Sequence, residues 1–220
     1  ALFLLKEPTA REVSNETHSI AARMRSFTTA GATLGVLFPL TILTILAFCM
    51  AGLESTFALW TERQLNWAVR EVSVFFLFIG LLMVLVQGGL VRPMSKRLGE
   101  GPLVIAGTLF MSAGFAMVLI VYSAPMAFVG GTLIAVGFGL ANPSLSALIS
   151  KNAPQEHQGA AMGASQSTQS LCRILGPISA GAAFGVFGRD APYLVGAILL
   201  FLASLIAIMA LKHAKRSQSG

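Results

Sequence analysis

Residues 165–181 of the chain read SQSTQSLCRILGPISAG, which places an arginine, two glutamines and a proline inside a long apolar run. That run covers about 160–187, the length of a helix that crosses a membrane. A helix in lipid rarely carries a charge near its middle. The way in which this segment accommodates Arg173 therefore bears on both the fold and the function.

Apolar runs of similar length occur five more times along the chain. Apolar residues make up 55% of it and charged residues only 11%, whereas soluble domains carry about a quarter charged residues. Too few polar side chains are present to cover a water-facing globule. We predict an all-α polytopic membrane protein with six transmembrane helices, near residues 35–60, 72–91, 102–122, 125–149, 160–187 and 191–211.

Lysine and arginine are distributed unevenly over the segments between these spans. Eleven lie before the first span, in the second and fourth loops and in the tail; they are Lys6, Arg11, Arg23, Arg25, Arg92, Lys96, Arg97, Lys151, Lys212, Lys215 and Arg216. Three lie on the other side, namely Arg63, Arg70 and Arg189. The positive-inside rule then places both termini in the cytoplasm. We expect a cytoplasmic linker, a six-helix bundle and a cytoplasmic tail, at 1–33, 34–211 and 212–220.

Sequence motifs of catalysis and of metal binding are missing. Cys49 and Cys172 fall inside apolar spans and form no CxxC pair. His157 is a single loop histidine without a second ligand, and no HExxH, GxSxG or Walker A pattern occurs. We expect no enzyme activity, no cofactor and no metal. The loop cations explain the net charge of +6, so nucleic acid is not an expected partner.

The polar residues of the quoted segment fall on one face of a helix. At 100° per residue five of them lie within about 60° of one line, namely Gln166, Gln169, Ser170, Arg173 and Pro177. Arg173 lies roughly 21 Å from a helix start near Gly159, too deep for its side chain to reach either surface. A lipid-exposed arginine at this depth costs from about +2.5 to beyond +10 kcal/mol. The face should therefore line an aqueous substrate or ion pathway, or form a buried polar seam between helices.

Prolines stand inside two of the predicted spans. Pro177 follows Gly176 in the fifth span, and Pro143 follows Asn142 in the fourth. Because proline removes a backbone hydrogen bond, we expect a bend at Pro177 and a broken helix at Pro143. A broken helix at membrane depth is typical of a cavity wall, which makes Asn142 a candidate pathway residue.

A carboxylate stands inside the first span. Glu54 lies about six residues, or roughly 9 Å, below Trp60, which together with Trp67 indicates the outer interface. A carboxyl group at this depth is a candidate proton carrier, because desolvation favours its neutral form. Two other interpretations stay open: an ion pair with Arg173, or a glutamate at the outer end that touches water.

Small residues recur at four-residue spacing in two spans. They are Ala127, Gly131, Ala135 and Gly139 in the fourth, and Gly159 and Gly163 at the start of the fifth. Such stripes let helix backbones approach closely in lipid. We expect the face with Gly159, Gly163 and Gly176 to pack against a further part of the protein.

Three stretches resemble the carboxyl-terminal half of a major facilitator superfamily transporter. They are QGGLVRPMSKRLGEGPLVIAG at 87–107, ANPSLSALIS at 141–150 and QGAAMGASQSTQSLCRILGPISAG at 158–181. The first contains the expected loop at 92–101 and resembles the second copy of the family's GxLxDRxGRR loop. Its matching residues are Gly88, Leu90, Arg97 and Gly99, and Arg92 stands near the place of the aspartate. The third resembles the Gly-Pro motif of antiporters through Gly176, Pro177 and Gly181.

The resemblance points to the twelve-span drug:proton antiporters, which include tetracycline efflux proteins. It implies half of a transporter in a bacterial inner membrane, which exports small amphiphilic molecules or drugs in exchange for protons by alternating access. It also implies a missing amino-terminal six-span half, and a central site faced by the first, second, fourth and fifth spans. Glu54 then resembles an acidic residue often found in the seventh span of that branch. A self-contained six-span protein with a structural, receptor or oligomeric channel role stays an alternative.

Overall fold

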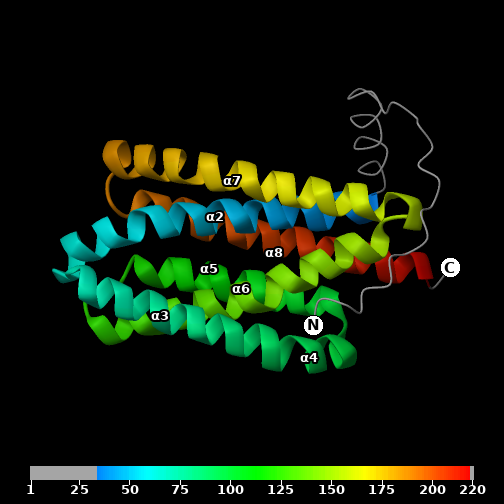
Figure 1. The fold of residues 1–220 in the computed structure, drawn as a ribbon, viewed down its shortest axis with the longest axis horizontal. Coiled ribbons are helices and arrows are strands. Elements are labelled where there is room, and N and C mark those ends of the chain that lie inside the picture. The colour runs from blue at the N-terminus through cyan, green and yellow to red at the C-terminus, as the bar shows by residue number, and fades with distance from the viewer. Residues whose placement is uncertain (1–33, 219–220) are drawn as a thin grey trace, which may run out of the picture.

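The computed structural model describes residues 34–218, with side chains for residues 35–212. Within this range every regular element is helical, and six helices are long and apolar enough to cross a membrane (Figure 1). The elements are α2 (Leu34–Leu65), α3 (Val69–Leu85), the π-helix η1 (Val86–Leu90), α4 (Val91–Leu98), α5 (Glu100–Val118), α6 (Ala124–Asn152), the 3-10 helix η2 (Gln155–His157), α7 (Gln158–Phe187) and α8 (Ala191–Gln218). The prediction of an all-α protein with six transmembrane helices is confirmed. The linker predicted over residues 1–33 lies outside the described residues.

The six long helices lie side by side as one elongated bundle (Figure 1). The start of α2 and the end of α8 lie at the same end of it, together with α4 and the turn between α6 and α7. The turn between α7 and α8 lies at the opposite end. The bundle therefore has one end that gathers the cation-rich segments of the sequence.

The helices α5 and α6 approach each other most closely at glycines. A Cβ atom added at Gly137 of α6 would lie 2.5 Å from the carbonyl oxygen of Gly107 of α5, and one added at Gly107 would lie 2.6 Å from the carbonyl oxygen of Gly137. Only a residue without a Cβ atom fits at either position. This pair lets the backbones of α5 and α6 pack directly against each other.

The small-residue stripe of α6 faces α3. Its members are buried, and a Cβ atom added at Gly131 would lie 2.6 Å from the ring of Phe75. One added at Gly139 would lie 2.8 Å from Val86. The stripe therefore packs helices of this chain together, as such stripes do in lipid.

Hydrogen bonds tie α2 to α8 and to the turn that precedes it. The buried indole of Trp60 donates from Nε1 to Oδ1 of Asp190 at 2.8 Å. The hydroxyl groups of Thr56 and Tyr193, both buried, lie 3.1 Å apart. Each such bond contributes about 1 kcal/mol, and burial makes its loss more costly. These bonds hold the end of α2 that also carries Glu54.

The loop predicted at residues 92–101 is wrong for most of its length, because Val91–Leu98 form α4. The π-helix η1 continues α3 into α4 without a gap. Pro93 lies in α4, three residues after the end of the π-helix η1. The helix ends at Gly99, whose φ of 81° favours glycine and whose N–H donates to the carbonyl of Ser95 at 2.9 Å.

The broken helix predicted at Pro143 is also wrong. The helix α6 is continuous from Ala124 to Asn152, and α7 is likewise continuous through Pro177. Each proline removes one backbone bond, and the bonds on both sides persist because no water competes for them at membrane depth. Neither proline therefore marks a helix break, and Asn142 lies within the continuous helix α6.

Two further segments differ from the expectation. Gly176 packs inside the chain, because a Cβ atom there would lie 2.8 Å from the Cβ atom of Ala51 on α2. Among the described residues no atom lies within 4 Å of a Cβ atom added at Gly159 or Gly163, so no described helix packs against those two glycines. The helix α8 runs on to Gln218, which makes most of the predicted tail from residue 212 helical.

Candidate functional site

The helix α7 presents three different faces. Small residues bury one face against α2, where the thiol of Cys172 lies 3.5 Å from the carbonyl oxygen of Thr44. A second face is apolar and exposed, with Ile174 60% and Ile178 64% exposed. The third carries the predicted polar residues, and at 100° per residue it is roughly 100° from the apolar one. Lipid suits the apolar face, so the polar face must be covered by something else.

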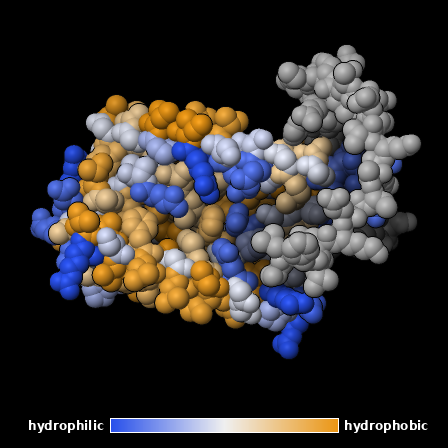
Figure 2. Space-filling view, viewed as in Figure 1, coloured by the Kyte–Doolittle hydropathy of each residue, from blue (hydrophilic) through white to orange (hydrophobic). Residues whose placement is uncertain are grey.

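The predicted polar residues do share this third face. Gln166, Ser170 and Arg173 are exposed, and Gln169 is half-buried with its Nε2 3.4 Å from the hydroxyl of Ser165. The hydroxyl of Ser170 donates to the carbonyl of Gln166 at 2.9 Å. Figure 2 shows hydrophilic side chains along the middle of the face that carries α7, between apolar bands above and below.

Arg173 lies at the centre of α7, with fifteen residues of the helix before it and fourteen after it. Its side chain is exposed, so the described helices do not enclose it in a buried seam. The ion pairs among residues 35–212 are Lys151 with Glu100 and Arg189 with Asp190. The ion pair of Arg173 with Glu54 is therefore not formed, and nothing within the described residues neutralises the guanidinium.

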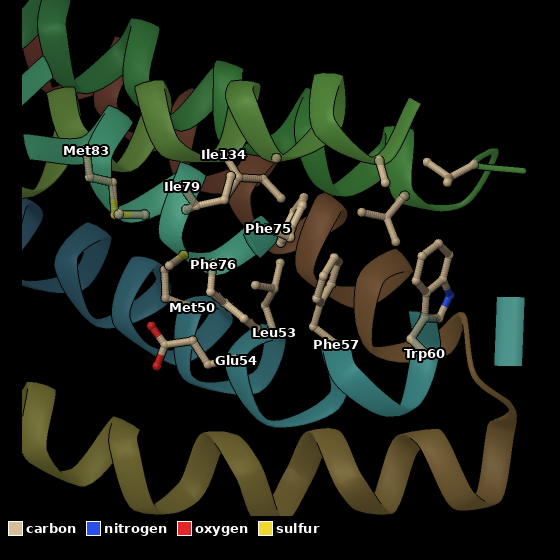
Figure 3. Close-up of a pocket in the computed structure, with 15 residues that line it drawn as sticks. Met50, Leu53, Glu54, Phe57, Trp60, Phe75, Phe76, Ile79, Met83 and Ile134 are labelled. Carbon is tan, nitrogen blue, oxygen red and sulfur yellow. The ribbon is translucent and has the colours of Figure 1, made fainter. Parts of the chain in front are cut away.

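Glu54 lies at the rim of a cavity of about 160 Å³ between α2 and α3 (Figure 3). The carboxylate is exposed and has no hydrogen bond or ion pair with residues 35–212. Fifteen residues line the cavity, and Glu54 is the charged one among them. The cavity is thus apolar inside and acidic at its rim.

Four aromatic rings and two methionines are among the fifteen residues that line the cavity. The rings of Phe57 on α2 and Phe75 on α3 stack with centroids 4.4 Å apart, and Phe76 stands at 74° to Phe57 (Figure 3). Met50 and Met83 contribute thioethers from the same two helices. Residues of α6 and the end of α5 form the remaining wall, among them Ile134, Val118 and Val121. The cavity therefore lies between α2 and α3.

The sequence analysis singled out Glu54 but missed the aromatic wall around it. A signal was present, since Met50, Phe57 and Trp60 recur on one face of the first span at helical spacing. Such residues are ordinary in any apolar span, and only the packing shows that they surround a space. Their spacing within the first span therefore does not connect them with the rings of the second span.

The remaining predicted residues lie outside this cavity. Asn142 is half-buried in α6 and does not line it. The residues of the motif that was predicted as a loop lie in η1 and α4 and just before α5. Gly88 and Leu90 are exposed in η1, and Arg92 and Arg97 are exposed on α4. The structure therefore separates the motif from the seam between α2 and α3.

Comparison with known sequences identifies the family. The family model of the Major Facilitator Superfamily matches residues 1–177 and 89–220. The chain belongs to this superfamily. Its members are transporters and not enzymes, and the six apolar helices make the chain an integral membrane protein.

Relatives come from both bacteria and animals. The chain is 29% identical over 157 residues to the class C tetracycline resistance protein of Escherichia coli, covering 69% of this chain and 39% of that protein. It is 25% identical over 189 residues to the human hippocampus abundant transcript-like protein 1, covering 76% and 37%.

A solved structure shows the same fold. The human organic anion transporter MFSD10 (TETRAN) aligns with a TM-score of 0.73 at 23% identity, over 85% of this chain and 46% of that one. The chain spans less than half the length of each of these three proteins.

Proposed function

We propose that the chain is the carboxyl-terminal half of a secondary transporter that exports small amphiphilic molecules in exchange for protons. A preceding six-helix half would complete it, and the two halves would rock about a central passage. The tetracycline resistance proteins among the relatives support export, and the share of each relative that the chain covers supports a missing half.

One observation carries this proposal, the exposed polar face of α7 with Arg173 at mid-depth. Lipid on this face would cost from about +2.5 to beyond +10 kcal/mol for the arginine alone. Water in a passage, or a carboxylate or substrate within it, removes most of that cost. A passage also explains why Gln166, Gln169 and Ser170 share a face with the arginine. A single charge in a buried seam between helices would not need these further polar residues on the same face.

The proposed roles follow from position. Arg173, Gln166, Gln169 and Ser170 face the passage and bind polar groups of the substrate. Glu54 on the neighbouring helix carries the proton, and Asn142 contributes a polar contact from α6.

The cation-rich end of the bundle is proposed to lie in the cytoplasm of a bacterial cell, with both termini on that side of the inner membrane. Arg92 and Arg97 on α4 and Lys151 at the end of α6 lie at this end. The end of α2 near Trp60 is then the outer one.

Accumulation in whole cells tests the proposal. We expect the full-length protein to lower the accumulation of tetracycline or a fluorescent amphiphile in a host that lacks its own exporters. A protonophore should restore accumulation, and Glu54→Gln should weaken export while the amount of protein in the membrane stays normal. Accumulation that does not change with expression contradicts export, and export that survives the protonophore contradicts proton coupling.

A further inference from the structure

A second cavity, of about 220 Å³, lies where α7 and α8 both pack on α2 (Figure 1). None of the fourteen described residues that line it is charged. The hydroxyl groups in its wall already bond within the chain. That of Ser179 donates to the carbonyl of Leu175 at 2.7 Å, and that of Tyr193 lies 3.1 Å from that of Thr56. The cavity therefore suits an apolar group and offers it no free polar partner.

The mouth of this cavity opens beside the apolar face of α7. Ser179 of α7 and Val195 of α8 both line the cavity and are exposed, so the opening lies between these two helices. At 100° per residue Ser179 lies about 40° from the exposed Leu175 and about 120° from Arg173. On α8, Ile198 is exposed as well. The cavity thus opens toward lipid and away from the proposed passage.

Two arginines lie beyond one end of the cavity, where α7 turns into α8. Arg63 shares a face of α2 with Gly52 of the cavity wall, because the eleven positions between them amount to about 20° of rotation and roughly 17 Å of rise. Its guanidinium lies 4.9 Å from the centroid of the Phe184 ring, and Phe184 directly follows Ala183 of the wall. Arg189 donates from Nη1 to the carbonyl of Arg63 at 3.3 Å. The two arginines therefore lie together at this end of the seam.

These arginines keep positive charge to offer a ligand. Arg63 is exposed and forms no ion pair with residues 35–212. Arg189 lies 3.8 Å from the carboxylate of Asp190, whose other oxygen accepts the indole N–H of Trp60. One carboxylate thus faces two guanidinium groups. Because a guanidinium binds phosphate through two parallel hydrogen bonds, a phosphate group matches this end of the seam.

We propose that the seam of α2, α7 and α8 binds one anionic phospholipid, with its phosphate at Arg63 and Arg189 and one acyl chain in the cavity. The rise of roughly 17 Å from Arg63 to Gly52 is close to the thickness of one leaflet, about half of a 30 Å hydrocarbon core. A free phosphate would leave the cavity unused, and an uncharged apolar molecule would leave the arginines unused. The proposal needs only the membrane, so it holds whether or not the protein exports drugs.

The size of the cavity limits what enters it. Its volume of about 220 Å³ exceeds that of an engineered apolar cavity of ~150 Å³ that holds a single benzene. It is smaller than the roughly 300–1,000 Å³ of complete drug sites. The cavity therefore holds part of one acyl chain, while the second chain stays on the apolar face of α7.

Titration of the purified full-length protein, followed by native mass spectrometry, measures this binding directly. The probes are dioleoylphosphatidylglycerol, dioleoylphosphatidylcholine, which has the same chains without net charge, and glycerol 1-phosphate, which has no acyl chain. We expect phosphatidylglycerol to bind most tightly, phosphatidylcholine several-fold more weakly, and glycerol 1-phosphate not measurably. Removing both charges, by Arg63→Gln with Arg189→Gln, should weaken phosphatidylglycerol binding roughly tenfold, since each guanidinium donates charge-assisted hydrogen bonds.

Matched variants separate this site from lipid that merely surrounds the bundle. Arg70→Gln removes an exposed arginine on α3, outside the seam, and should leave binding unchanged. Ser179→Phe closes the mouth of the cavity and should weaken binding several-fold, whereas Ile178→Phe on the neighbouring apolar face should not. The melting temperature of each variant shows that it is folded. Ala183→Leu, which fills part of the cavity, replaces Ser179→Phe if that variant does not fold.

Four outcomes overturn the site. Two are binding of phosphatidylglycerol that stays equal in the folded double arginine variant, or in the folded variant that closes or fills the cavity. The third is an equal loss in Arg70→Gln or Ile178→Phe, which would show lipid bound without a defined site. The last is binding of phosphatidylcholine or of glycerol 1-phosphate as tight as that of phosphatidylglycerol, which would remove the role of the charge or of the acyl chain.

Discussion

The helices α6 and α7 resemble each other in sequence and differ in what surrounds them. Both contain an internal proline and small residues at four-residue spacing. The glycines of α6 are closed in on two sides, by α5 at Gly137 and by α3 at Gly131. On α7, a Cβ atom added at Gly159, Gly163 or Gly181 would meet no atom of the described part of the chain within 4 Å. The same spacing thus marks a filled interface in one helix and an open surface in the other.

Polar residues are what distinguish the two helices. Over residues 127–139 the face of α6 that carries its stripe is apolar, so close packing within the chain satisfies this part of the helix. The open face of α7 carries Arg173 and its neighbours, which apolar packing cannot satisfy. A small-residue stripe is therefore a sign of packing, and a polar face beside one is a sign of a passage.

The largest expected effect is on folding, through one added methyl group on α6. In Gly137→Ala the new Cβ atom would lie 2.5 Å from the carbonyl oxygen of Gly107, so the backbones must separate. Overpacking of this kind costs about 1–3 kcal/mol, and we expect a lower melting temperature and less folded protein in the membrane.

Gly181→Ala on α7 is the matched control. No atom of residues 35–212 lies within 4 Å of the added carbon, and alanine favours a helix over glycine by up to about 1 kcal/mol. We expect stability equal to or above that of the wild type. Equal damage by the two substitutions would show that α7 is as tightly enclosed as α6.

A smaller effect, on transport alone, is expected from Arg173→Lys. Lysine keeps the charge but lacks the planar fork that binds a carboxylate or phosphate through two hydrogen bonds. We expect export to fall roughly tenfold, equivalent to about 1.4 kcal/mol, while the melting temperature changes little. A lysine variant that exports at the wild-type rate would show that only the charge at this position matters.

The smallest expected effects come from two serines that make the same local hydrogen bond. Ser144 on α6 is buried and donates to the carbonyl of Leu140 at 2.7 Å, and Ser170 on α7 is exposed and donates to that of Gln166 at 2.9 Å.

Ser144→Ala should lower stability by about 0.5–1 kcal/mol and leave export unchanged. Ser170→Ala should leave stability unchanged and weaken export about two-fold, because its hydroxyl is proposed to face substrate. Thermal unfolding and accumulation assays measure both. The reverse result, with Ser170 supporting stability, would place α7 in a packed interface.

The positions of the six spans could be predicted from the sequence, but the points at which a helix ends or is interrupted could not. Long apolar runs are set by the thickness of the membrane, so the six helices could be predicted from length alone. The expectation at Pro143 failed because it was inferred from proline alone. The expectation at residues 92–101 failed because charged residues between two apolar runs indicate where a span ends, but a helix can continue beyond the span. Proline removes one hydrogen bond, and at membrane depth the neighbouring bonds hold the helix together.

The two parts of the candidate site were unequally predictable. The face of α7 follows from helical periodicity within one segment, so Gln166 and Arg173 could be placed together from sequence. Phe57 of α2 and Phe75 of α3 both line the cavity. The spacing of residues within one helix does not show which residues of another helix it contacts. Glu54 could be selected because a charge in an apolar span is rare, but its ring-lined neighbourhood required the structure.

The most direct measurement of the central claim asks whether water reaches position 173. Arg173→Cys would be made in the full-length protein without Cys49 and Cys172, with Ile178→Cys on the apolar face of α7 as the control. We predict that a small hydrophilic thiol reagent modifies position 173 in the membrane, that a transported substrate slows this reaction, and that position 178 does not react. A cysteine at 173 that is inert in every conformational state, or no more reactive than the one at 178, would contradict a water-filled passage along α7.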